Sequence, residues 1–158
     1  MPIKDYTFTR LGDDPPRPML WVRVTNPHTN VGLIALAIVD TGSDECAIPA
    51  QAAFQLGHDL ESVTPKEVNT AGGKTWAYPH TSKIEILEKR PDGRAGDKVL
   101  YTIPNTLVDF TKGLKTFLLG TRNFLGKFVL KIDYPRRVLS IRAPQPSRPK
   151  KLKKRRRR

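Results

Sequence analysis

The chain has 158 residues, of which 38% are hydrophobic, and its formal net charge at pH 7 is +13. This size and composition suit one folded domain with a sizeable core. The single cysteine, Cys46, excludes a disulfide within the chain, and no apolar run is long enough to cross a membrane. We therefore expect a soluble, cytoplasmic protein.

The positive charge is unevenly distributed. Nine of the +13 formal charges lie in residues 148–158, so the preceding residues retain only +4. A proline-rich segment that ends in an unbroken basic run cannot bury apolar surface, which predicts a disordered tail over residues 143–158. Residues 148–158 could make weak, salt-sensitive contact with a polyanion.

The first part of the chain predicts strands joined by turns. Residues 1–18 form an N-terminal arm rich in proline and turn residues, with a short strand at 6–9. Strands are expected at 19–25 and 31–39, joined by a turn at 26–30. A short strand at 45–48 precedes a short helix at 49–56, which Gly57 would terminate.

The second part of the chain continues in the same way. An apolar strand is expected to enter a glycine turn and a short helix within residues 116–125. Further strands are expected at 83–87, 99–103, 106–110, 128–133 and 137–142. A count of about nine short strands with at most two short helices predicts an all-β domain.

Asp40 is the residue that most needs an explanation. Seven apolar residues, 33–39, run directly into Asp40-Thr41-Gly42-Ser43 and predict a buried strand that ends at a carboxylate. A carboxylate in that position is costly unless it is hydrogen-bonded or functional. The alternative is an ordinary turn, because Asp and Gly are both common turn formers.

A second feature is the segment 68–78, in which two strand-like arms flank Ala71-Gly72-Gly73. This composition predicts a mobile hairpin. Taken by itself, the segment is equally compatible with an ordinary surface hairpin.

These features together resemble the retropepsin-like, single-domain aspartic proteases. The resemblance is based on Ala-Ile-Val-Asp-Thr-Gly-Ser at 37–43, the Gly-Gly hairpin at 70–75, and Phe-Leu-Leu-Gly at 117–120 followed by Asn-Phe-Leu at 123–125. It covers about residues 19–142, which we take as the protease-like domain. It implies a closed acid-protease β-barrel with one or two short helices and a flap hairpin.

The resemblance also implies a mechanism and an oligomeric state. Enzymes of this type hydrolyse peptide bonds with a water molecule activated between two carboxylates that share one proton. This chain contains one Asp-Thr-Gly, so the implied enzyme is a homodimer that uses Asp40 of each subunit on a two-fold axis. Residues near 138–141 would help to build the sheet between the two subunits.

Roles for individual residues follow from the same resemblance. Asp40 would be catalytic, Thr41 would hydrogen-bond across the dimer axis, and Gly42 would leave room for substrate backbone. Ser43 and Asp44 would contribute to substrate binding. Backbone groups of Ala71, Gly72 and Gly73 would close over an extended peptide or protein substrate.

The sequence departs from the family pattern after Gly120, the glycine of Phe-Leu-Leu-Gly. Relatives usually have an arginine directly after that glycine, whereas Thr121 separates Gly120 from Arg122 here. The sequence therefore does not decide whether Arg122 pairs with Asp44. No metal or other cofactor is expected, since the chain has three scattered histidines and one cysteine.

Two other functions remain compatible with the sequence. A basic nucleic-acid-binding β-protein would use the tail, although the body lacks the series of aromatic residues on which such modules stack bases. A catalytically silent protease-like fold would serve as an interaction module.

Overall fold

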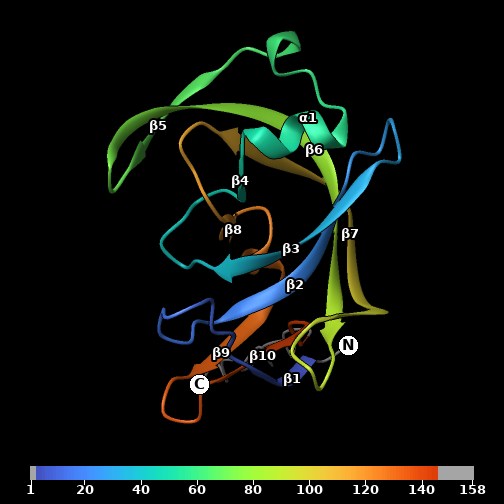
Figure 1. The fold of residues 1–158 in the computed structure, drawn as a ribbon, viewed down its shortest axis with the longest axis vertical. Coiled ribbons are helices and arrows are strands. Elements are labelled where there is room, and N and C mark those ends of the chain that lie inside the picture. The colour runs from blue at the N-terminus through green and yellow to red at the C-terminus, as the bar shows by residue number, and fades with distance from the viewer. Residues whose placement is uncertain (1–2, 146–158) are drawn as a thin grey trace, which may run out of the picture.

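The computed structural model describes residues 3–145 and shows a protein built almost entirely of β-strands (Figure 1). The basic tail is predicted over residues 143–158, of which residues 146–158 lie outside the described residues. The ten strands of the described part are β1 (Ile3–Thr7), β2 (Met19–Thr25), β3 (Gly32–Val39), β4 (Ala47–Pro49), β5 (Lys66–Thr70), β6 (Gly73–Lys89), β7 (Ala95–Thr111), β8 (Phe117–Leu119), β9 (Val129–Asp133) and β10 (Val138–Arg142).

Six of these strands close into a barrel. Neighbouring strands are hydrogen-bonded in the order β2-β3-β8-β4-β7-β6, and β6 pairs again with β2 to complete the ring. β5 pairs with β6 outside this ring and forms a hairpin that arches over one end of the molecule in Figure 1. The prediction of an all-β closed barrel with a projecting hairpin is confirmed.

A separate three-stranded sheet lies at the opposite end of the molecule from β5 (Figure 1). β10 is its middle strand, with β1 on one edge and β9 on the other. Both edges of β10 are paired within one chain, so residues 138–141 offer no free edge of their own, and a role of this sheet between two subunits stays a prediction. The free edges of this sheet belong to β1 and β9.

Helical structure is sparse, as predicted. The α-helix α1 spans Gln51–Leu56, and two short 3-10 turns, η1 and η2, span Leu60–Ser62 and Leu125–Lys127. α1 ends at Gly57, whose φ of 71° is left-handed and whose N–H caps the last turn. Among the described residues, no helix is long and apolar enough to span a membrane.

The core lies inside the barrel and extends to the three-stranded sheet. Residues from β1, β2 and β10 contribute to one continuous apolar cluster, which includes Ile3, Leu20, Val22, Leu139 and Ile141. β3 differs from the prediction of a fully buried strand. Ala37 and Val39 are buried, but Ile34 is 48% exposed because alternate residues of this strand point outward.

The β6–β7 hairpin is longer than the sequence predicted. Each strand has 17 residues, and β7 continues through Pro104, where the sequence suggested a break. The register shifts between Ser82 and Ile84, so that Pro104 and Asn105 together oppose Lys83. This bulge accommodates the proline, which has no backbone N–H to donate to a neighbouring strand.

Candidate active site

Asp40 directly follows β3, one of the strands that form the barrel wall. β3 runs parallel to β8, and the Asp40 N–H donates to the Leu119 carbonyl at 3.2 Å. The N–H of Gly42 donates to Asp40 Oδ1 at 3.0 Å, so the turn itself orients the carboxylate. Asp40 is half-buried, whereas Thr41 and Gly42 are exposed at the surface.

The Asp40 carboxylate is not held in a closed ion pair. Among the salt bridges formed within residues 3–145, none involves Asp40. Its one side-chain hydrogen bond in this part of the chain comes from the Gly42 backbone. The carboxylate therefore keeps acceptor capacity for water or for a second acid.

The loop after β8 is joined to the Asp40 loop by backbone contacts. The Thr121 N–H donates to the Ser43 carbonyl at 2.9 Å, and the Arg122 N–H donates to the Asp44 carbonyl at 2.8 Å. The Thr121 hydroxyl also donates to the Ser43 carbonyl, at 3.1 Å. These bonds fix the two loops as one unit.

Gly120 explains why the two loops can approach so closely. A Cβ at this position would lie 2.2 Å from the Glu45 carbonyl oxygen and 2.3 Å from its carbonyl carbon. Backbone atoms cannot move aside as a flexible side chain can, so only glycine fits here. The Phe-Leu-Leu-Gly element thus has a packing role directly behind the Asp40 loop.

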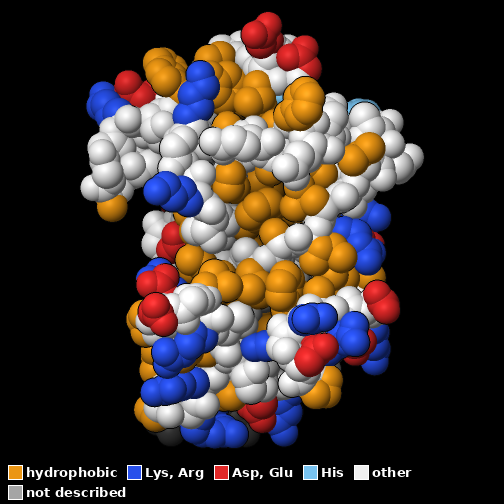
Figure 2. Space-filling view, viewed as in Figure 1, with side chains coloured by type: hydrophobic (Ala, Val, Ile, Leu, Met, Phe, Trp, Pro, Cys, Tyr) orange, Lys and Arg blue, Asp and Glu red, His pale blue; other side chains and the backbone are white. Residues whose placement is uncertain are grey.

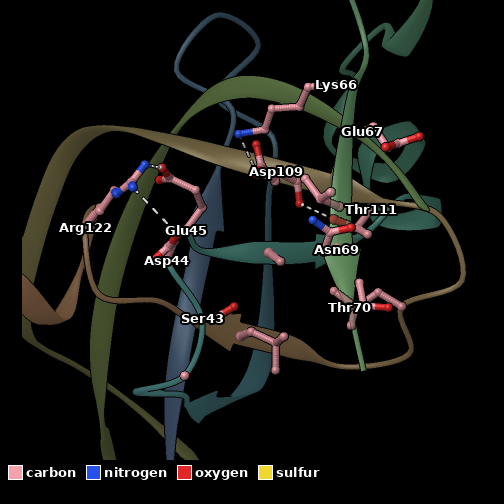
Figure 3. A pocket seen from close by; sticks show the side chains of 15 residues that line it. Ser43, Asp44, Glu45, Lys66, Glu67, Asn69, Thr70, Asp109, Thr111 and Arg122 are labelled. Atoms are coloured by element: carbon pink, nitrogen blue, oxygen red, sulfur yellow. Dashed lines mark hydrogen bonds and ion pairs between the residues drawn. The ribbon is translucent and has the colours of Figure 1, made fainter. Parts of the chain in front are cut away.

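The structure also brings Arg122 to Asp44 despite the intervening Thr121. The Arg122 guanidinium lies 3.6 Å from Asp44 Oδ2 and 3.4 Å from Glu45 Oε1 (Figure 3). Asn123 also donates to the Glu45 carboxylate. Because the Arg122 and Asp44 side chains are mostly exposed, the pair adds little stability.

The hairpin formed by β5 and the start of β6, residues 66–77, contains residues 70–75, which the sequence predicts as the flap, and we call this hairpin the flap below. Its tip contains Ala71, Gly72 and Gly73, all exposed, and Gly73 has a left-handed φ of 106°. The Thr70 hydroxyl closes the turn by donating to the Gly73 carbonyl at 2.7 Å and accepting from the Gly72 N–H at 3.2 Å.

A groove of about 460 Å³ lies between the Asp40 loop and the flap. Beneath the overhanging β5 hairpin the surface is hollowed in the space-filling view (Figure 2). The Asp40 loop contributes Gly42, Ser43 and Asp44 to the lining, and the flap contributes residues 66–70. Asp40, Ala71, Gly72 and Gly73 are not among the lining side chains, so one chain alone does not join all the predicted residues in one cavity.

Several lining residues were not predicted from the sequence. They include Glu45, Lys66, Glu67, Asp109, Leu114 and Leu118. Of these, Asp109 carried a signal, because it is an acid inside the otherwise apolar run Leu107-Val108-Asp109-Phe110. An acid in a buried strand requires a partner or a function.

Two other ionisable features, the Cys46 thiol and a pair of histidines, lie outside the groove lining. Burial raises the pKa of the Cys46 thiol to about 11, so the reactive thiolate form is disfavoured at neutral pH. The rings of His58 and His80 lie 4.6 Å apart beside Phe110. Burial, and then the neighbouring His80, lower the pKa of His58 to about 4. No metal-binding group of His, Cys, Asp or Glu is found within residues 3–145.

Comparison with solved structures shows the fold. The chain is similar to a retropepsin-like aspartic protease from Rickettsia conorii, with a TM-score of 0.58, 21% identity and coverage of 89% of each chain. It also matches EIAV protease complexed with the inhibitor HBY-793, with a TM-score of 0.37 and 16% identity over 70% of this chain and 88% of that one. No family model and no curated protein sequence matches the chain.

Proposed function

We propose that this chain, whose fold is that of the retropepsin-like aspartic proteases, is an aspartic endopeptidase that acts as a homodimer. The proposal rests on the orientation of the Asp40 carboxylate and on its lack of a cation partner within the described residues. The carboxylate is oriented by the Gly42 N–H on a rigid loop, and it has no cation partner within the described residues.

The dimer follows from the chemistry. Hydrolysis requires one carboxylate as general base toward water and a second, protonated carboxyl group as acid toward the scissile carbonyl. Two carboxylates a few Å apart cannot both ionise, so the pair shares one proton. With one Asp-Thr-Gly in the sequence, the second carboxyl group would be Asp40 of the partner subunit.

The surface around Asp40 supports this arrangement. Thr41 and Gly42 are exposed although they belong to a tightly held turn, and the groove of one chain stops short of Asp40. A symmetric partner would cover this turn and extend the groove across the two-fold axis. Thr41 would then hydrogen-bond across the axis, while Ser43, Asp44 and the flap tip would hold an extended peptide.

The alternatives make different predictions. The nucleic-acid hypothesis depends on residues 148–158, outside the described part of the chain, so deleting residues 143–158 would abolish function under that hypothesis and spare peptidase activity under ours. A catalytically silent protease-like fold would cleave no peptide, so Asp40→Asn would leave the cleavage assay unchanged.

The test is cleavage of a peptide library by wild-type protein and by Asp40→Asn. We expect the variant to keep its fold, as judged by circular dichroism, and to lose at least about a hundredfold in kcat/KM, the usual contribution of one general acid–base group. Asp92→Asn, on an exposed loop, serves as a matched control. Equal cleavage by wild type and Asp40→Asn would contradict the proposal.

A further inference from the structure

Asp109 is a buried acid in the wall of the groove. It lies on β7 opposite Ala47 of β4, and its side chain is only 7% exposed. Its neighbours in sequence, Val108 and Phe110, are fully buried. Asp109 Oδ2 pairs with Lys66 Nζ at 2.9 Å, but Oδ1 has no hydrogen-bond partner within the described part of the chain. A buried acceptor without a partner is unfavourable, because it has lost its hydrogen bonds to water.

Lys66 reaches Asp109 from the flap, across the groove (Figure 3). It is the first residue of β5, which pairs with β6 alone within the described sheets, and its side chain is 41% exposed. The flap arm must move for a peptide to enter between it and the barrel. That movement would withdraw the ammonium and leave both oxygens of a buried carboxylate without a partner.

The other charges of the groove do not compensate Asp109. Arg122 is already engaged by Asp44 and Glu45, and Glu67 pairs with Lys74 at 2.6 Å. The lining as a whole has four carboxylates, from Asp44, Glu45, Glu67 and Asp109, but only two cations, from Lys66 and Arg122. Because Lys74 balances Glu67, the groove retains an excess of one negative charge although the chain carries a net charge of +13.

We propose that Asp109 is a specificity-determining residue and that it selects a substrate side chain ending in an ammonium or a guanidinium, lysine or arginine. This inference rests on the proposed function, since it assigns a substrate class to the same groove. Lys66 occupies the position of the substrate cation when the groove is empty. An arginine can bond both oxygens of a carboxylate through its planar fork, which would also satisfy Oδ1.

The experiment is a positional scan of acetylated octapeptides, read by mass spectrometry, with the full-length protein. We expect lysine and arginine to be enriched at one position by about tenfold or more in kcat/KM over methionine, as a charge-assisted hydrogen bond would give. Asp109→Asn should remove this preference. Lys66→Met should strengthen it, because the competing internal cation is gone, and Asp92→Asn should leave it unchanged.

Asp109→Asn is expected to remove the preference for basic side chains, whereas Lys66→Met is expected to strengthen it. If Asp109→Asn does not fold, the Lys66→Met result alone decides the test. Enrichment of aspartate or glutamate would assign recognition to Lys66 and overturn the inference. Cleavage with no basic preference at any position would also overturn it while leaving the proposed function intact.

A binding measurement separates the inference from catalysis. Immobilised Asp40→Asn protein is incubated with the same library, and the retained peptides are identified. We expect retention of peptides with lysine or arginine, reduced to background in the double variant Asp40→Asn/Asp109→Asn. If wild type cleaves nothing yet this retention is seen, the peptidase proposal fails and the basic-side-chain site remains. Retention without basic enrichment contradicts the site.

Discussion

The Asp40 loop and the flap lie on opposite sides of the same groove but are held in different ways. The Asp40 loop donates a backbone hydrogen bond to β8 and accepts others from the loop that follows β8, and it packs against Gly120 without room for a side chain. The flap arm β5 is hydrogen-bonded along one edge and reaches the barrel wall through the Lys66–Asp109 pair. The comparison indicates a firmly held Asp40 loop and a less constrained flap. Under the proposed function, the first would position the acid and the second would open to admit a peptide.

Glycine substitutions should show this contrast most strongly. Gly120→Ala places a Cβ against the Glu45 backbone, and we expect it to lower the free energy of unfolding by about 3 kcal/mol, at the upper end for overpacking. Gly72→Ala at the flap tip meets only the Thr70 hydroxyl at 3.7 Å, an ordinary contact, and should change stability by less than about 0.5 kcal/mol. Urea unfolding of both variants provides the comparison, and equal losses would contradict it.

The ion pair beneath the flap should have a smaller and more local effect. Lys66→Met leaves the buried Asp109 carboxylate without its cation, so we expect a loss of about 1–2 kcal/mol. Hydrogen exchange should become faster in residues 66–77 and stay unchanged in β3 and β8. Faster exchange in all strands alike would mean that Lys66 stabilises the whole barrel rather than the flap. Adding Asp109→Leu to Lys66→Met should recover most of the lost stability.

Acidification should lower the stability of the region around β6, which carries the flap, before it affects the Asp40 loop. His58 follows α1, and His80 lies on β6, the strand that carries the flap. Burial lowers the pKa of both rings, that of His58 to about 4, although Asp59 opposes the shift at His80. A lowered pKa means that the unfolded chain binds protons first, so stability is full above about pH 6.5 and is lost as pH falls toward 4.

The corresponding variant is His58→Gln, which cannot titrate. We expect its Tm to fall less between pH 6.5 and pH 4 than the Tm of wild type, because one of the two suppressed protonations is removed. Differential scanning fluorimetry across this range measures the slope. A slope equal to that of wild type in His58→Gln would show that the histidine pair does not govern acid stability.

Arg122→Gln should have the smallest effect. The Arg122 and Asp44 side chains are 67% and 74% exposed, and exposed pairs contribute about 0–1 kcal/mol. We expect a change below about 0.5 kcal/mol in unfolding free energy, since the backbone bonds at Thr121 and Arg122 remain. A loss above about 2 kcal/mol would show that side-chain charges, rather than the backbone contacts, hold the Asp40 loop.

The sequence predicted the Asp40 loop better than the contacts between the flap and the barrel wall. Asp40 could be placed because seven apolar residues lead directly to Asp-Thr-Gly, and the glycine of Phe-Leu-Leu-Gly marked the close approach that the structure shows at Gly120. Both signals are local along the chain. The flap tip was likewise marked by its glycines.

The remaining features depend on contacts between distant residues. Lys66 and Asp109 are 43 positions apart in sequence and meet only because β5 folds over the barrel wall. The middle position of β10 depends on pairing with β1 from the other end of the chain. Pro104 suggested a strand break, but a bulge in the β6–β7 pairing absorbs it. Local patterns cannot predict such pairings, because they carry no information about which strands meet.

Subunit mixing tests most directly whether each catalytic acid comes from a different chain. Differently tagged wild-type and Asp40→Asn subunits are co-expressed, and the mixed dimer is purified through both tags and assayed for peptide cleavage. If the water is activated between the two Asp40 carboxylates, the mixed dimer is as inactive as the Asp40→Asn homodimer. A mixed species with half of the wild-type activity would contradict this, because it would show that one subunit catalyses the reaction alone.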